Sequence, residues 1–190
     1  MRSSGCYKIP AGWQILSRHR KEMGMTKRAQ GKFERKPRDF YVTPHDAVLP
    51  LLLHLAPGTH FHEPCAGDGD LVRHLEAAGH ICDAAGDIDT GRDALDIIGT
   101  PADTFITNPP WDRRILHPLI EHLSNIKPTW LLFDADWMHT QQAKPYAHRC
   151  REVVSVGRVS WMGNGVSGFD NCAWYLFDIT GERTEFYWRI

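Results

Sequence analysis

Short apolar stretches alternate with amphipathic ones from about residue 43 to the end of the chain. Short strands bounded by polar or turn residues are predicted at 60–63, 80–87, 104–107 and 130–135. Helices are predicted at 43–55, 69–78, 115–125 and 139–149. We expect the first helix to begin with Thr43 as its N-cap and Pro44 at its first helical position. Strands that alternate with helices favour an α/β fold with a mostly parallel sheet and helices on both faces.

Two further strands, at 152–161 and 172–179, follow one another without a helix between them, and this order favours an antiparallel terminal hairpin. Residues 1–38 have no sustained periodicity, and Gly31 and Pro37 interrupt them. The predicted organisation is therefore an N-terminal arm at 1–38 and a folded domain at 39–190.

Composition narrows the class of protein. A hydrophobic fraction of 42% is ample for the core of one domain. There is no apolar run long enough to cross a membrane and no apolar signal segment, so we expect a cytoplasmic protein without membrane contact. The five cysteines form no CxxC pair, which argues against a zinc site and a disulfide framework, and no metal is expected.

The net charge of −1 hides an asymmetry. Residues 1–40 carry eleven Lys or Arg against three Asp or Glu, whereas residues 41–190 carry eleven against twenty. A basic arm joined to an acidic body points to nucleic acid. A solvated tail without a partner explains the same charges equally well.

The segment Glu63-Pro64-Cys65-Ala66-Gly67-Asp68-Gly69 lies where a predicted strand turns into a helix. Its glycines let a ligand approach the backbone closely, at the end of a strand where open α/β sheets bind their ligands. The segment is neither GxGxxG nor GxxxxGK[ST]. Its acids suit a cationic ligand with an amino acid moiety, such as a sulfonium cofactor, better than a phosphate. A purely structural turn is the alternative.

The next predicted strand ends at Gly86-Asp87-Ile88-Asp89. An acid there, about 20 residues after a glycine turn, is placed to accept hydrogen bonds from both ribose hydroxyls. Asp87 is the first candidate for this role and Asp89 the second; for each the alternative is an exposed loop acid.

A second chemical motif, Asn108-Pro109-Pro110-Trp111, directly follows the strand predicted at 104–107. The Asn108 side-chain oxygen and the Pro109 carbonyl are two acceptors that can hold both hydrogens of an amino group and free its lone pair. Trp111 offers an aromatic face on which a planar base can stack. A base in duplex DNA must first be flipped out of the helix. A proline-rich structural turn is the alternative.

Together, the glycine turn, Asp87 and the 108–111 motif resemble the amino-group branch of the class I S-adenosylmethionine-dependent methyltransferases. The upstream segment Asp39-Phe40-Tyr41-Val42-Thr43-Pro44 is similar to that branch's F-Y-x-T-P motif. Three later segments make small phage or prophage-type DNA adenine-N6 methyltransferases the closest likeness: Asp134-Ala135-Asp136-Trp137-Met138, Gly157-Arg158-Val159-Ser160-Trp161 and Asp170-Asn171-Cys172-Ala173-Trp174-Tyr175.

The resemblance covers residues 39–180 and implies a Rossmann-like methyltransferase fold, with a catalytic domain at 39–190. It implies S-adenosyl-L-methionine as cofactor, S-adenosyl-L-homocysteine as product and DNA as partner. The implied cofactor-binding residues are Tyr41, Thr43, Pro44, Glu63, Cys65, Ala66, Gly67, Asp87, Asp93, Ala94 and Asn108. The implied catalytic residues are Asn108, Pro109, Pro110 and Trp111. The resemblance gives Asp170 and Asn171 no mechanism; shaping the target pocket and forming a loop turn are both open.

Only 79 residues follow Trp111, and we expect them to be needed to finish the sheet, which leaves little or no dedicated recognition domain. Specificity would then be relaxed, or supplied by the arm and the loop at 162–171. RNA adenine-N6 methylation is an alternative. So is methylation of a protein glutamine N5, although those enzymes usually carry Tyr where this chain has Trp111. A non-catalytic nucleic-acid-binding module is a further, disfavoured alternative. The oligomeric state is not predicted.

Overall fold

The computed structural model describes residues 42–161, 168 and 170–189. The arm predicted at 1–38, the cofactor residue Tyr41 and most of the loop at 162–171 lie outside the described residues.

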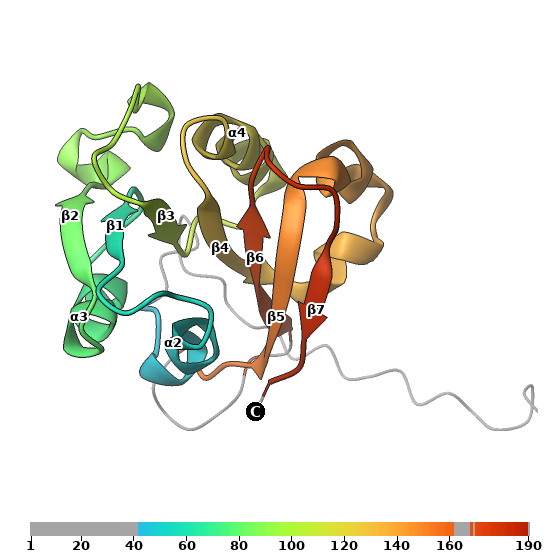
Figure 1. The fold of residues 1–190 in the computed structure, drawn as a ribbon, viewed down its shortest axis with the longest axis horizontal. Coiled ribbons are helices and arrows are strands. Elements are labelled where there is room, and N and C mark those ends of the chain that lie inside the picture. Colours follow the sequence, from blue (N-terminus) through green and yellow to red (C-terminus); the bar gives the residue numbers. More distant parts are fainter. Residues whose placement is uncertain (1–41, 162–167, 169, 190) are drawn as a thin grey trace, which may run out of the picture. The chain divides into compact units, whose positions relative to one another are not determined.

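A seven-stranded sheet with the strand order β2-β1-β3-β4-β6-β5-β7 organises the chain (Figure 1). Its strands are β1 (His60–Glu63), β2 (Ile81–Ala85), β3 (Thr104–Thr107), β4 (Thr129–Asp134), β5 (Cys150–Arg158), β6 (Asn171–Phe177) and β7 (Glu185–Tyr187). The pairs from β2 to β4 are parallel, whereas β6 runs antiparallel between β4 and β5. The predicted α/β class, mostly parallel sheet and terminal antiparallel hairpin are confirmed.

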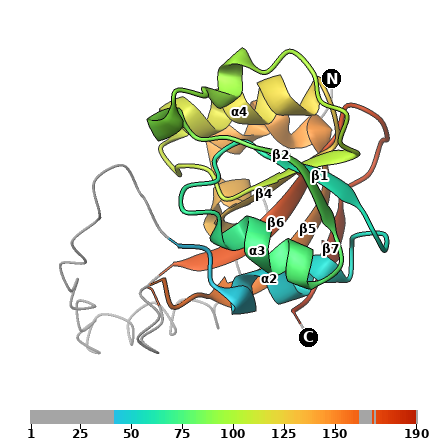
Figure 2. The ribbon, with the colours of Figure 1, turned by 90° about the vertical axis from the view of Figure 1, so that its left-hand side faces the viewer.

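Helices cover both faces of this sheet, as predicted (Figure 2). The α-helices are α2 (His45–Leu52), α3 (Asp70–Ala77) and α4 (Arg113–Ser124). The 3-10 segments are η2 (Ile88–Thr90), η3 (Ala94–Asp96), η4 (Ala135–His139) and η5 (Gln141–Arg149). Helices α2 and α3 pack on one face, while α4 and η5 pack on the other.

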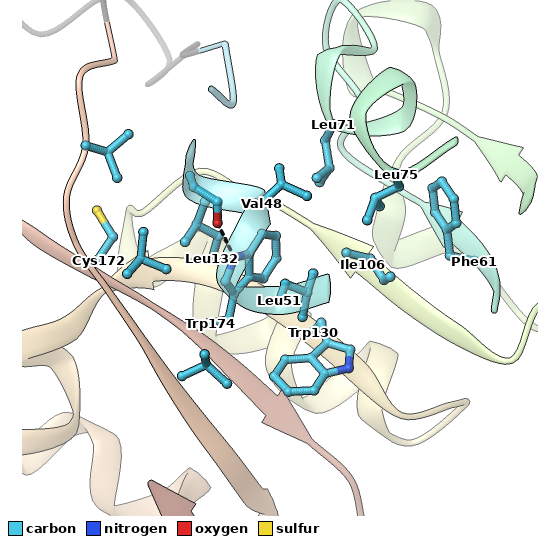
Figure 3. Close-up of a cluster of buried hydrophobic side chains, with 14 residues drawn as sticks. Val48, Leu51, Phe61, Leu71, Leu75, Ile106, Trp130, Leu132, Cys172 and Trp174 are labelled. Atoms are coloured by element: carbon cyan, nitrogen blue, oxygen red, sulfur yellow. Dashed lines mark hydrogen bonds between the residues drawn. The ribbon is translucent and has the colours of Figure 1, made fainter. Parts of the chain in front are cut away.

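Strand β4 shows why two layers form. Successive side chains of a strand point to opposite faces, and all but the last residue of β4 are buried. Trp130 and Leu132 pack toward α2 and α3, whereas Leu131 and Phe133 pack toward α4. In the cluster of buried side chains between the sheet and the helices α2 and α3, the indole of Trp174 on β6 donates a hydrogen bond of 2.7 Å to the Ala47 carbonyl of α2 (Figure 3). This bond attaches α2 to the antiparallel half of the sheet.

The strand order reverses at β1, which has β2 on one side and β3 on the other. In open α/β sheets, the crevice outside the carboxyl ends of the two strands at such a switch point is where ligands bind. Both chemical motifs lie there, because the glycine turn follows β1 and Asn108 follows β3.

Two local predictions are wrong, and one strand was not predicted. The N-cap of α2 is Pro44 and not Thr43, because the Thr43 hydroxyl is directed to another residue, described below. The segment predicted as a helix at 139–149 forms 3-10 turns, and Pro145 inside it removes a backbone donor that a regular α-helix needs. Strand β7 was not predicted; it has only three residues, and all three are exposed.

Candidate active site

The turn after β1 is held in place by backbone hydrogen bonds to the end of β2. The Gly86 amide donates to the Glu63 carbonyl at 2.9 Å, and the Ala66 amide donates to the Gly86 carbonyl at 2.8 Å. Gly67 and Gly69 have φ angles of 50° and 80°, in the left-handed region that favours glycine. The glycines predicted from the sequence are therefore required by the path of the backbone.

Glu63 is almost fully buried at the end of β1. Burial raises the pKa of its carboxyl to about 8, against the opposing effects of the Thr107 hydroxyl and of the Cys65 amide, which donates to Oε1 at 2.9 Å. Thr107 Oγ1 is itself buried and has no partner at standard hydrogen-bond geometry. Glu63 and Thr107 therefore form a buried polar pair at the ends of the neighbouring strands β1 and β3.

Asp87 lies directly beyond β2, beside the same turn. Its Oδ2 accepts from the Gly67 amide and its Oδ1 from the Asp89 amide, both at 2.9 Å. Each carboxylate oxygen retains a further lone pair, so the group is held in position and can still accept from hydroxyls. The second candidate, Asp89, lies exposed in η2.

The chain between β2 and β3 returns to the glycine turn. The Asp93 carboxylate accepts from the Leu95 amide at 2.9 Å and caps η3. Ala94 is buried in a cluster with Phe105 of β3, and Cys65 packs against this cluster. Burial raises the pKa of the Cys65 thiol to about 12, so it is a neutral packing group.

Asn108 directly follows β3, and both ends of its side-chain amide lie near hydrogen-bonding groups. Its Nδ2 donates to Thr43 Oγ1 at 3.1 Å. Its Oδ1 lies 3.4 Å from the indole Nε1 of Trp111, which also donates to the Leu132 carbonyl at 3.2 Å. Pro109 is buried and Pro110 half-buried. The predicted tetrapeptide is thus anchored to both the segment before α2 and to β4.

Trp111 is half-buried and packs against both large core clusters. Its ring meets that of Trp161, beyond β5, edge to face at 5.7 Å and 83°. Sequence reasoning gave Trp161 no role of its own. No local pattern indicates this contact, because Trp111 and Trp161 lie far apart in the sequence.

Asp170, to which the resemblance gave no mechanism, lies near the end of β4. Asp134 ends β4 and pairs with Cys172 of β6, so that Asp170 lies close to it. Burial and the charges of Asp136 and Asp170 raise the pKa of Asp134, while the charge of Arg113 lowers it. These contacts join the 134–138 and 170–175 segments to each other.

None of the helices in the described part of the chain is long and apolar enough to span a membrane. No three His, Cys, Asp or Glu side chains in the same part of the chain are grouped so as to hold a metal ion.

No protein-family model matches the chain, and no curated protein is similar to it in sequence. Similar solved structures include a candidate class I S-adenosylmethionine-dependent methyltransferase from Listeria monocytogenes, with 10% identity, 93% of this chain and 70% of that one covered, and a TM-score of 0.53. A dimethyladenosine transferase from Plasmodium falciparum has 14% identity over 73% of this chain and a TM-score of 0.50; the match spans 62% of that protein's length. A candidate RNA methyltransferase from Pyrococcus horikoshii has 12% identity, 76% and 90% coverage, and a TM-score of 0.50. These likenesses show a Rossmann-like fold shared with methyltransferases.

Proposed function

We propose that this protein is an S-adenosylmethionine-dependent methyltransferase whose target is the exocyclic N6 amino group of adenine in DNA. The observation that carries the proposal is the position of two motifs at one switch point. The glycine turn with Glu63 and Asp87 lies on one side, and the Asn108-Pro109 acceptors lie at the end of the neighbouring strand.

The residues around the turn fit the cofactor that the fold suggests. Glu63 and the unsatisfied Thr107 hydroxyl suit its ammonium group, and Asp87 suits its ribose hydroxyls. Asp93 and Ala94 lie where an adenine ring would meet the turn. The other cofactor residues in this proposal are Tyr41, Pro44, Cys65, Ala66 and Gly67. When bound, the cofactor supplies an electrophilic methyl group on a sulfonium.

The target amine is activated by hydrogen bonds alone. Asn108 Oδ1 and the Pro109 carbonyl accept its two hydrogens, which takes the lone pair out of conjugation with the ring. The lone pair freed in this way could accept the methyl group of a bound sulfonium cofactor, whose sulfur would keep the electrons of the broken S–C bond. The nitrogen loses its extra proton to water after the transfer, so no strong general base is needed. Catalysis rests on alignment and preorganised dipoles.

Trp111 supports a planar target. Its half-buried ring lies against Trp161, next to the acceptors, where a flipped base would need an aromatic surface. The basic arm favours a nucleic acid over a protein glutamine, since it can neutralise phosphates. RNA adenine is the second candidate. It is supported by two of the similar structures, which are a dimethyladenosine transferase and a candidate RNA methyltransferase.

Transfer of a radiolabelled methyl group tests the proposal against its rivals. The full-length protein is incubated with labelled cofactor and, separately, with duplex DNA, single-stranded DNA, RNA or protein. We expect label in DNA. Label in RNA alone or in protein alone would show that the protein transfers methyl groups but that its substrate is not DNA. Absence of label together with absence of heat on titration with S-adenosylmethionine would make the chain a non-catalytic module.

A further inference from the structure

Thr43 is a buried side chain whose hydroxyl serves another element. Only 5% of the residue is exposed, at the entrance to α2. A threonine at this position commonly caps the helix, yet the N-cap of α2 is Pro44 and makes no side-chain cap hydrogen bond. Instead, Thr43 Oγ1 accepts from Nδ2 of Asn108, 65 residues further along the chain.

This hydrogen bond anchors one end of the Asn108 amide, and the indole of Trp111 lies at the other end. The oxygen and the NH2 group of an asparagine exchange places on a half-turn about the last side-chain bond, and only the oxygen can accept from a target amine. With Nδ2 on Thr43, Oδ1 lies toward the indole N–H of Trp111 at 3.4 Å. The indole N–H only donates, so the reversed amide would place a donor against it, and this contact selects the orientation. The Thr43 hydroxyl, which can donate or accept, then holds the amide in that orientation through Nδ2.

The two contacts differ in what happens when a target arrives. The indole N–H also has the Leu132 carbonyl as an acceptor at 3.2 Å, closer than its 3.4 Å approach to Asn108. The indole N–H therefore still has an acceptor when Oδ1 accepts a hydrogen bond from a target amine. The hydrogen bond from Asn108 to Thr43 involves the opposite end of the amide and stays unchanged.

We propose that Thr43 is a positioning residue for methyl transfer, which holds the Asn108 amide with its oxygen directed at the target amine. This inference rests on the proposed function. It gives Thr43 a role distinct from the cofactor contact that family resemblance implies. Because loss of alignment of the target amine slows the reaction without removing a contact to the cofactor, kcat and cofactor affinity should separate.

Thr43→Val tests the role, because valine keeps the shape of threonine and lacks the hydroxyl. Thr43→Ser keeps the hydroxyl and is the matched control. In the full-length protein we expect Thr43→Val to lower kcat about 10- to 100-fold while the cofactor Kd stays within about twofold, and Thr43→Ser to retain kcat within about threefold. An unchanged kcat in Thr43→Val overturns the inference. A parallel loss of kcat and cofactor affinity also overturns it, because it makes Thr43 a cofactor contact.

A second measurement keeps this test separate from the proposed function. The side-chain amide of Asn108 gives a pair of signals in a 15N-correlated NMR spectrum, identified by their loss in Asn108→Asp. We expect Thr43→Val to shift these two signals and Thr43→Ser to leave them near their original positions. The rest of the spectrum should show that both variants are folded. Unshifted signals in Thr43→Val contradict the inference whether or not the protein transfers methyl groups. If the wild-type protein transfers no methyl group, that result contradicts the proposed function and not the role of Thr43.

Discussion

At the scale of single residues, Glu63 lowers the stability of the fold at neutral pH, because its carboxyl is buried. A carboxyl has an ordinary pKa near 4.5, and burial raises that of Glu63 to about 8. The folded state therefore binds more protons than the unfolded state between these values, and stability falls as the pH rises through them. A residue kept at this cost to stability is typical of a functional site.

Glu63→Gln should remove this dependence, because glutamine cannot ionise. Below pH 4.5 the wild type is expected to have its full free energy of unfolding. Above this pH it should lose about 1.4 kcal/mol of that free energy per pH unit up to about pH 8, which amounts to about 3 kcal/mol at pH 7. Melting temperatures of both proteins at pH 5 and pH 7.5 measure the effect. We expect Glu63→Gln to gain on the wild type at the higher pH. A constant difference between the two would show that Glu63 is ionised in the folded protein.

Single residues were selected from the sequence by their local chain position. Glu63, Asp87 and Asn108 were chosen from strand ends and turn composition, and the fold places them at the ends of the neighbouring strands β1, β2 and β3, while their roles stay predictions. The orientation of Asn108 was not predicted, because its partner Thr43 lies 65 residues away and its sequence neighbours suggested a helix cap. Long-range side-chain pairs leave no periodic signal in a sequence.

At the scale of elements, short buried strands were predicted best. β1 and β3 have the predicted bounds, because turn residues or polar groups flank each of them. β7 was missed because an edge strand of three exposed residues has no apolar pattern. The η5 segment was predicted as a helix from its composition, and the short 3-10 turns there follow from Pro145 and from packing against α4.

The junction between α2 and β6 is the element-scale contact on which the position of Thr43 depends. Trp174 is fully buried there and donates to the Ala47 carbonyl. Trp174→Phe removes both volume and this hydrogen bond, and it should lower the free energy of unfolding by about 2–3 kcal/mol in urea titration. Trp188→Phe, at a residue 86% exposed, is the matched control and should change the free energy by less than about 0.5 kcal/mol. Equal effects of the two substitutions would contradict this account of the junction.

At the scale of the whole molecule, charge is divided between the two parts of the chain. Residues 1–40 are strongly basic, while residues 41–190 carry twenty acids against eleven basic residues. In the folded part, acids gather around the proposed cofactor at Glu63, Asp87 and Asp93. Phosphate contacts of a nucleic acid therefore depend on the arm, according to the proposed function.

Deleting residues 1–24 should weaken nucleic-acid binding and reduce its dependence on salt. This segment carries five Lys or Arg, so the slope of log K against log salt should fall by up to about 4. Affinities measured at several salt concentrations give the slope. A chain of full length with those five residues changed to Gln is the control, and it should behave like the deletion. An unchanged slope in both would leave this segment without a role in binding.

The central claim is that Asn108 and the glycine turn transfer a methyl group to the amino nitrogen of adenine. Mass analysis of the nucleosides from DNA treated with the protein and S-adenosylmethionine tests it most directly. The wild type should produce N6-methyldeoxyadenosine. Asn108→Ala should lose this product by a factor of about 100 or more, as expected for loss of a transition-state acceptor, while its cofactor affinity is nearly unchanged. Methylation on another atom, or full activity in Asn108→Ala, would contradict the account.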